Sequence, residues 1–210
     1  MPEDHTHPSR RSVRRPPTTR VTALLLGLAA IPGYAHTGHG TSSWFEGLVH
    51  PFGLDHMLAM IAVGTWSVFA LPPQRAWWGP AAFMLALIIG AITGWSVGVP
   101  GWLEHAVALS VVVFGLMLMA AQRRWPVPLG MGLIAAGAAL HGLAHGAETP
   151  ESGFAGYAAG FLLTTLALHM SGVTAGLSLR RWAAARARWL LAAAGGATGL
   201  AGLVLMGRLA

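Results

Sequence analysis

The sequence contains no cysteine and no lysine, and only 10% of its residues are charged. Without cysteine the chain forms no disulfide and offers no thiolate to a metal, so any metal site must use imidazole and carboxylate groups. A soluble domain carries about 25% charged residues, so the scarcity of charge predicts a membrane protein. All 13 basic residues are arginines, and their clustering at the N-terminus and in loops does not favour nucleic acid as a partner.

The first 35 residues have the pattern of a signal peptide. Five arginines in the first twenty positions precede the apolar stretch 21–31, which is too short to cross a bilayer. Gly33 and Ala35 then supply the small residues of a cleavage site. A twin-arginine signal at 9–13 is a weaker alternative to ordinary secretory export. We therefore expect a signal peptide at 1–35, a histidine-containing periplasmic leader at 36–49, and a membrane domain at 50–210.

Six apolar segments follow, each close to the ~20 residues that a membrane-spanning helix needs. They are residues 53–71, 79–97, 103–121, 127–146, 154–179 and 189–206. The sequence thus predicts an all-α membrane protein with a six-helix transmembrane bundle after a cleaved signal peptide. Glycines at every fourth position, such as Gly90, Gly94 and Gly98, predict close helix packing, because small residues let helix backbones approach.

The loop charges predict the orientation of this bundle. The first, third and fifth loops carry Arg75, Arg123, Arg124, Arg180, Arg181, Arg186 and Arg188, whereas the second and fourth carry no arginine. Under the positive-inside rule the arginine loops face the cytoplasm, so both mature termini lie in the periplasm. The signal peptide predicts the same orientation independently, and together they favour the inner membrane of a bacterium.

With this orientation, most histidines and acids near helix ends fall on the periplasmic side. They are His50, Asp55 and His56 in the first segment, Glu104 and His105 in the third, and His141, His145 and Glu148 after or within the fourth. His141 and His145 stand four residues apart, so their rings share one helix face and can bind one metal ion. Three segments far apart in sequence therefore predict a shared metal site.

Some of these residues have simpler interpretations. His105 is better explained as an interfacial histidine that is hydrogen-bonded to water. Glu104 is better explained as a residue that only caps its helix. Asp55 is alternatively a helix-start residue, the pair His141 and His145 is alternatively structural, and Glu148 is equally well a solvated loop residue.

Three further histidines complete the candidate set. His36 would become the first residue after cleavage, where its α-amine and ring form a small chelate with His39 nearby; an unstructured polar leader is an equal alternative. His169 falls near the middle of the fifth segment. An imidazole at that depth either bonds to a neighbouring helix or receives a cation on its way inward, and the sequence does not decide between them.

Three stretches resemble the HupE/UreJ family of membrane proteins. They are HPFGLDHMLAMIAVGTWS at 50–67, HGLAHGAETP at 141–150, and GYAAGFLLTTLALHMSG at 156–172, which includes His169. In the first, the spacing from histidine to aspartate is one residue shorter than the family often has. The resemblance implies nickel supply to hydrogenases and ureases. Carried over by position, it also implies functional roles for His50, Asp55, His56, His141, His145 and Glu148.

The resulting hypothesis is a permease at 50–210 that takes up Ni²⁺ from the periplasm, with Co²⁺, Cu²⁺ and Zn²⁺ left open. It predicts no enzymatic activity, no permanently bound cofactor, and the ion and the bilayer as partners; association into a homo-oligomer stays open. The main alternative is a zinc-dependent intramembrane hydrolase that uses the His/Asp cluster, although HGLAH lacks the internal glutamate of His-Glu-x-x-His enzymes. A haem-binding bundle is a further alternative, which requires histidines facing each other on two helices.

Overall fold

The computed structural model describes residues 44–123, 126–147 and 154–209, so the expected signal peptide and most of the leader lie outside the described residues. Within these ranges the chain forms helices and short connections. In chain order they are α2 (Trp44–Val49), η1 (His50–Phe52), α3 (Leu54–Ala70), η2 (Pro73–Arg75), α4 (Trp78–Val97), α5 (Leu103–Met119), α6 (Val127–Ala147), α7 (Phe154–Trp182), η3 (Ala184–Arg186) and α8 (Ala187–Arg208).

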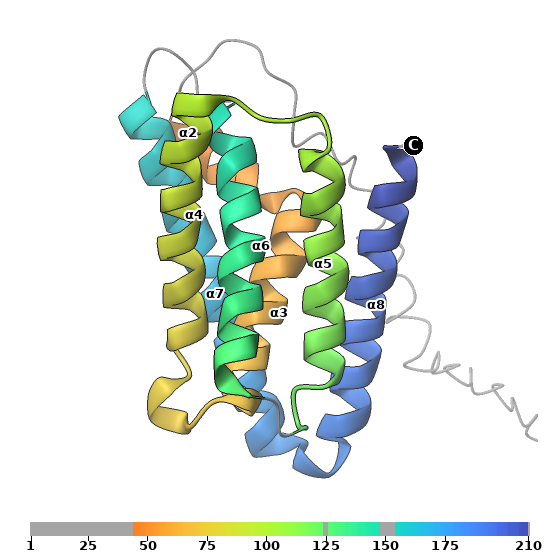
Figure 1. Ribbon diagram of the computed structural model, residues 1–210. Helices are drawn as coiled ribbons and strands as arrows, with labels where there is room; N and C mark the ends of the chain where they lie inside the picture. Colours follow the sequence, from red (N-terminus) through yellow and green to blue (C-terminus); the bar gives the residue numbers. More distant parts are fainter. Residues whose placement is uncertain (1–43, 124–125, 148–153, 210) are drawn as a thin grey trace, which may run out of the picture. The chain divides into compact units, whose positions relative to one another are not determined.

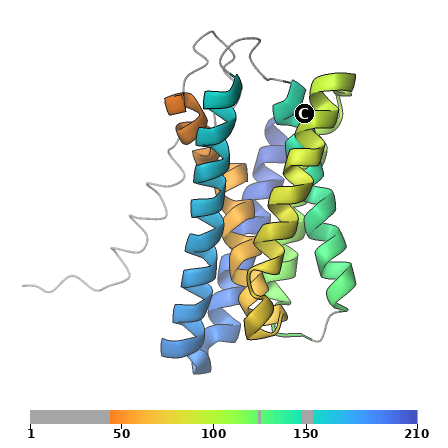
Figure 2. The same ribbon diagram turned by 90° about the vertical axis from the view of Figure 1, so that its left-hand side faces the viewer.

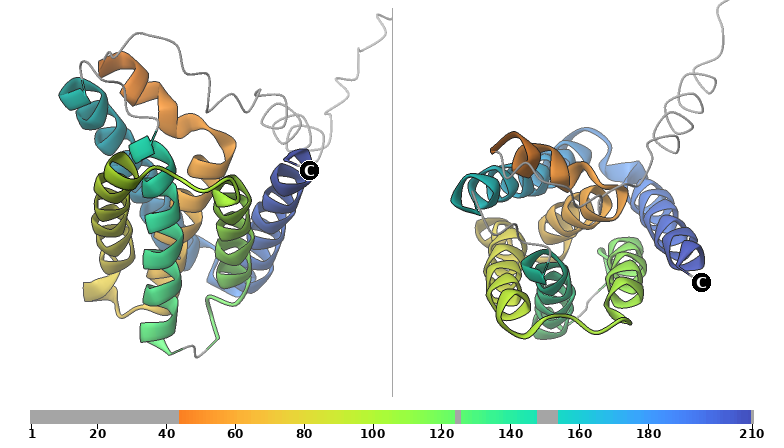
Figure 3. Two further views of the ribbon diagram at one scale, coloured as in Figure 1. Left: turned by 45° about the horizontal axis from the view of Figure 1, so that its top comes forward. Right: turned by 90° about the horizontal axis from the view of Figure 1, so that it is seen from above.

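The long helices pack in pairs. The most extensive contacts join α4 with α6, α5 with α8, and α3 with α7 (Figures 1 and 2). Helix α3 also contacts α4, α5 and α8, and it lies among the other helices when they are seen from above (Figure 3, right). Ala59, Met60 and Val63 of α3 are accordingly almost fully buried. The first histidine motif therefore begins a helix that packs against α4, α5, α7 and α8.

Glycines set the closeness of the α4–α6 pair. A Cβ added to Gly90 or Gly94 of α4 would overlap the backbone of α6, and one added to Gly142 would overlap the backbone of Leu87 in α4. The predicted close packing is therefore confirmed at Gly90 and Gly94. It is wrong for Gly98, which caps the C-terminus of α4 with φ +76°; a Cβ added there would meet no described atom within 4 Å. Glycine suits that position because L side chains rarely adopt this conformation.

This packing predicts opposite effects for two glycine substitutions. Gly90→Ala should destabilise the protein by about 1–3 kcal/mol, because the new methyl group forces α4 away from Ala139. Gly132→Ala in α6 is the control: a Cβ there meets nothing within 4 Å, and alanine favours the helix by up to about 1 kcal/mol. Thermal unfolding of both variants in detergent measures the difference. An unfolding midpoint of Gly90→Ala equal to that of wild type would contradict the close approach.

The described helices supply four to five candidate membrane spans. Four are long and apolar enough by themselves: 73–97, 127–147, 154–182 and 184–208. The segment 44–52 and helix α3 make a fifth if the bent pair, which turns by 72°, is counted as one span. Helix α5, with 17 residues, is shorter. A helix occupies each of the six predicted apolar segments, but a count of six spans stays a prediction.

The two ends of the helix bundle differ in character. The connections that follow α3, α5 and α7 lie at one end, the lower end in Figure 1, and they contain Arg75, Arg123 and Arg186. The C-terminal end of α6, which carries His145, lies at the opposite end. The arginines of these three connections therefore lie at the end opposite His145, whereas Arg208, in the last turn of α8, lies at the same end as His145.

Candidate metal centre

A break before α3 positions the first histidine. Pro51 lies in the single turn η1, and Gly53 separates this turn from α3. Proline cannot donate a backbone hydrogen bond, and it favours a helix start over a helix interior. The resulting bend brings the His50 ring back over the start of α3, where its centroid lies 5.8 Å from that of His56. The two histidines of this motif thus face one space although a helix boundary lies between them.

Helix α6 supplies the second pair of histidines. His141 and His145 are one turn apart, and their exposed fractions are 0% and 5%. The ring centroid of His56 lies 4.8 Å from that of His141 and 4.5 Å from that of His145. His50 lies 4.6 Å from His145 by the same measure. Four imidazoles from two segments about 90 residues apart therefore meet in one cluster, in which His56, His141 and His145 are buried and His50 is half-buried.

His56 is the centre of this cluster. Its Nδ1 lies 2.8 Å from the carboxylate oxygen Oδ1 of Asp55, and its Nε2 faces the Nε2 of His145. The side chain of Asp55 is 14% exposed and that of His56 is 1% exposed. Burying a carboxylate and several imidazoles together costs desolvation free energy unless these groups hydrogen-bond to one another or bind a cation. The two nitrogens of His56 thus face different neighbours.

Two groups of three residues can hold a metal ion among the residues that the structure describes. One is His50, His56 and His145; the other is Asp55, His56 and His141. In each group the ligand atoms lie within 4.8 Å of one another. Imidazole nitrogen with a carboxylate suits Ni²⁺, Cu²⁺, Zn²⁺ or Co²⁺ better than Mg²⁺ or Ca²⁺, which prefer oxygen. His56 belongs to both groups.

His169 lies outside both groups. It is fully buried in α7, and its Nδ1 donates a hydrogen bond of 2.8 Å to the carbonyl oxygen of Thr165. Its Nε2 is buried without a hydrogen-bond partner among the described residues. The ring of Phe83 contacts His169 at 4.6 Å and also lies 6.1 Å from His141. One aromatic side chain therefore touches both the cluster and the deeper histidine.

Of the remaining candidates from the sequence, some lie outside the described residues and the others lie outside the two metal-capable groups. His36, His39 and Glu148 lie outside the described residues. Glu104 and His105 begin α5 and belong to neither metal-capable group. His105 is exposed, which makes it a suitable control residue for experiments on the buried histidines.

The family comparison covers nearly the whole chain. The model of the family described as "HupE / UreJ protein" matches residues 23–205. This chain belongs to the HupE/UreJ family. It is 38% identical over 191 residues to Protein HupE of Rhizobium leguminosarum bv. viciae, and the match covers 90% of this chain and 96% of that protein. No solved structure matches the chain. The HupE/UreJ family is linked to nickel supply, and the apolar helices make this member a multi-pass membrane protein.

Three residues of this HupE/UreJ protein lie beside the cluster but were not among the site residues predicted from the sequence. Phe161 of α7 lies 4.8 Å from the His145 ring, and Tyr157 lies 5.8 Å from that of His50. Their spacing of four residues on one helix face was a signal that could have found them. Ser110 of α5 contacts His141 at 3.0 Å. Its only sequence signal was a hydroxyl within an apolar run.

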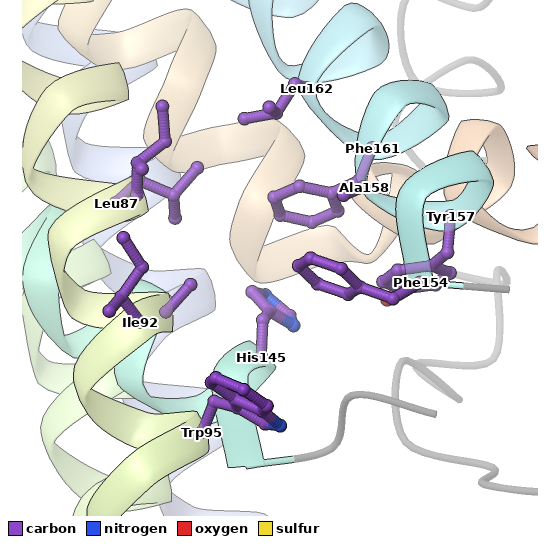
Figure 4. Close-up of a pocket in the computed structure, with 11 residues that line it drawn as sticks. Leu87, Ile92, Trp95, His145, Phe154, Tyr157, Ala158, Phe161 and Leu162 are labelled. Atoms are coloured by element: carbon purple, nitrogen blue, oxygen red, sulfur yellow. The ribbon is translucent and has the colours of Figure 1, made fainter. Parts of the chain in front are cut away.

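An apolar pocket of about 350 Å³ reaches the cluster from the side, between α4 and α7. Figure 4 shows His145 among its lining side chains, with Trp95 of α4 and Phe154 of α7 nearby. Trp95 is 74% exposed and Phe154 is 54% exposed. One histidine of this HupE/UreJ protein is therefore next to a space that suits an apolar molecule.

Proposed function

We propose that this chain is a permease that takes up nickel, or a similar divalent transition metal ion, from the periplasm to the cytoplasm for maturation of hydrogenase or urease. One observation carries the proposal: Asp55 and His56 meet His141 and His145 of a distant helix in one buried cluster. This donor set suits Ni²⁺, while Co²⁺, Cu²⁺ and Zn²⁺ bind the same ligand types. Membership of a family linked to nickel supply supports the choice of nickel.

The proposed orientation places the histidine cluster on the periplasmic side of the inner membrane. The separation of Arg75, Arg123 and Arg186 from the cluster along the bundle supports it, because arginine is retained on the cytoplasmic side. We propose six spans, with α5 crossing despite a length of about 25 Å. Both mature termini are then periplasmic, after cleavage of the signal peptide that ends at Ala35.

Asp55 and the histidines have different tasks in the proposed capture step. A divalent ion loses much of its hydration when it enters a buried site, and the Asp55 carboxylate offsets part of that cost with its negative charge. The imidazoles replace water as ligands and favour transition metals over Mg²⁺ and Ca²⁺. His36, His39 and Glu148 are proposed to collect ions at the periplasmic mouth, ahead of the cluster.

His169 is the proposed next station toward the cytoplasm. Its Nδ1 carries the proton that binds Thr165, so Nε2 has the lone pair that a metal ion needs. Phe83 touches the rings of both His141 and His169, so an ion moving from one to the other must displace or pass this side chain. The cluster and His169 thus become successive sites on one route.

Nickel accumulation in cells without their own nickel importers tests the proposal. With matched membrane levels, Asp55→Ala and His141→Ala are each expected to lower uptake of radioactive Ni²⁺ at least about tenfold, since loss of even an outer-shell residue of a metal site costs 10–100-fold. His105→Ala is the control, because that exposed histidine lies outside the cluster, and it should keep wild-type uptake. Equal background accumulation in all strains, wild type included, would refute a nickel permease.

The apolar pocket beside His145 is the observation that favours a second candidate function, that of a zinc-dependent hydrolase. A hydrolase for membrane substrates needs a lateral space for an apolar substrate, and the pocket supplies one that ends at a candidate metal ligand. Three histidines around a metal ion with Asp55 nearby would also serve to activate water. Zinc-dependent cleavage of an apolar ester by the purified protein, lost in His145→Ala, would support this function over transport.

A further inference from the structure

The side-chain hydroxyl of Ser110 has one proton and lies within hydrogen-bonding distance of two groups. Its Oγ lies 2.7 Å from the carbonyl oxygen of Val107 and 3.0 Å from the Nε2 of His141. The serine is 6% exposed and His141 is fully buried, so water does not replace either contact easily. Because a hydroxyl carries one hydrogen, it donates to one neighbour and accepts from the other.

The carbonyl of Val107 decides the direction of both bonds. A carbonyl oxygen only accepts, so the 2.7 Å contact requires the Ser110 proton. The Ser110 oxygen then accepts from His141, whose proton must be on Nε2. In the opposite arrangement, two oxygens would face each other at 2.7 Å with no hydrogen between them, although this distance is that of an O–H···O hydrogen bond and is repulsive without the proton. The hydrogen bonds therefore fix the tautomer of His141.

We infer that Ser110 is a positioning residue for the metal centre: it holds the proton of His141 on Nε2 and thereby reserves Nδ1, with its lone pair, for the metal ion. A neutral imidazole has one protonated nitrogen and one that can bind metal, and the hydrogen bond made by the first determines which is which. His141 belongs to the metal-capable group with Asp55 and His56. The inference rests on the proposed function for the identity of the ligand.

Nickel binding to the purified full-length protein in detergent tests this role. Ser110→Ala is expected to weaken the affinity for Ni²⁺ by about 10–100-fold, the range found when an outer-shell partner of a metal-binding histidine is removed. Ser110→Thr keeps the hydroxyl and should restore most of the affinity. Ser67→Ala is the matched control: Ser67 is also buried and donates to the carbonyl of Val63, but no histidine among the described residues bonds to its hydroxyl.

Nitrogen NMR of ¹⁵N-histidine-labelled protein, assigned with His141→Gln, gives a readout that loss of stability would not mimic. We expect the Nε2–H tautomer at His141 in the metal-free wild type and a mixture of tautomers in Ser110→Ala. An Nδ1–H tautomer in wild type, or Ni²⁺ affinity unchanged in Ser110→Ala, would overturn the inference. A wild type that binds Ni²⁺ without transporting it would refute the permease and leave the Ser110 inference standing.

Discussion

His56→Ala is expected to lower the affinity of the purified protein for Ni²⁺ at least about 100-fold, the upper end of the loss seen for residues that only support a metal site. The reason is that both metal-capable groups contain His56. Its removal leaves only two ligand residues in each group, fewer than the three that each group offers a metal ion. Isothermal titration of Ni²⁺ into detergent-purified protein measures the change.

Single substitutions of the other ligands in the two groups provide affinities for Ni²⁺ with which that of His56→Ala can be compared. His50→Ala removes a ligand from one group and His141→Ala removes a ligand from the other, so each should weaken binding less than His56→Ala does. His56→Gln keeps a polar side chain of similar size in the cavity and separates loss of a ligand from loss of packing. An affinity for His56→Gln equal to that of His105→Ala would show that His56 binds no metal.

His169→Gln should separate metal binding from metal transport. The outer cluster is expected to bind Ni²⁺ as in wild type, because His169 belongs to neither group. Uptake into cells should fall at least about tenfold, since the inward route loses the nitrogen ligand proposed to receive the ion. Radioactive Ni²⁺ accumulation and titration of the same purified variant give the two quantities.

The choice of glutamine preserves the local structure around this position. Its amide nitrogen can still donate to the carbonyl oxygen of Thr165, as His169 does, but the side chain has no imidazole lone pair. His169→Leu removes both properties and serves as the comparison, with thermal unfolding as a check on stability. Wild-type uptake by a stable His169→Gln variant would exclude His169 from the transport route.

The helices themselves were predictable because their signals are local. The apolar run at 79–97 is close to α4 (Trp78–Val97), and the run at 127–146 is close to α6 (Val127–Ala147). Long apolar runs bounded by proline, glycine or arginine leave the backbone few alternatives to a helix in a membrane. The spacing of His141 and His145 likewise fixed a shared helix face, because the α-helical period requires it.

The tertiary structure alone decided which helices meet and which nitrogens face each other. These helices are apolar on every side, so their periodicity does not show which face contacts which neighbour. The pairing of α4 with α6 depends on where glycines allow backbones to approach, and that choice requires two helices at once. The contact between Ser110 and His141 depends in the same way on the packing of α5 against α6. The sequence therefore determined the helices and the ligand types, and only the packing brought the ligands into one centre.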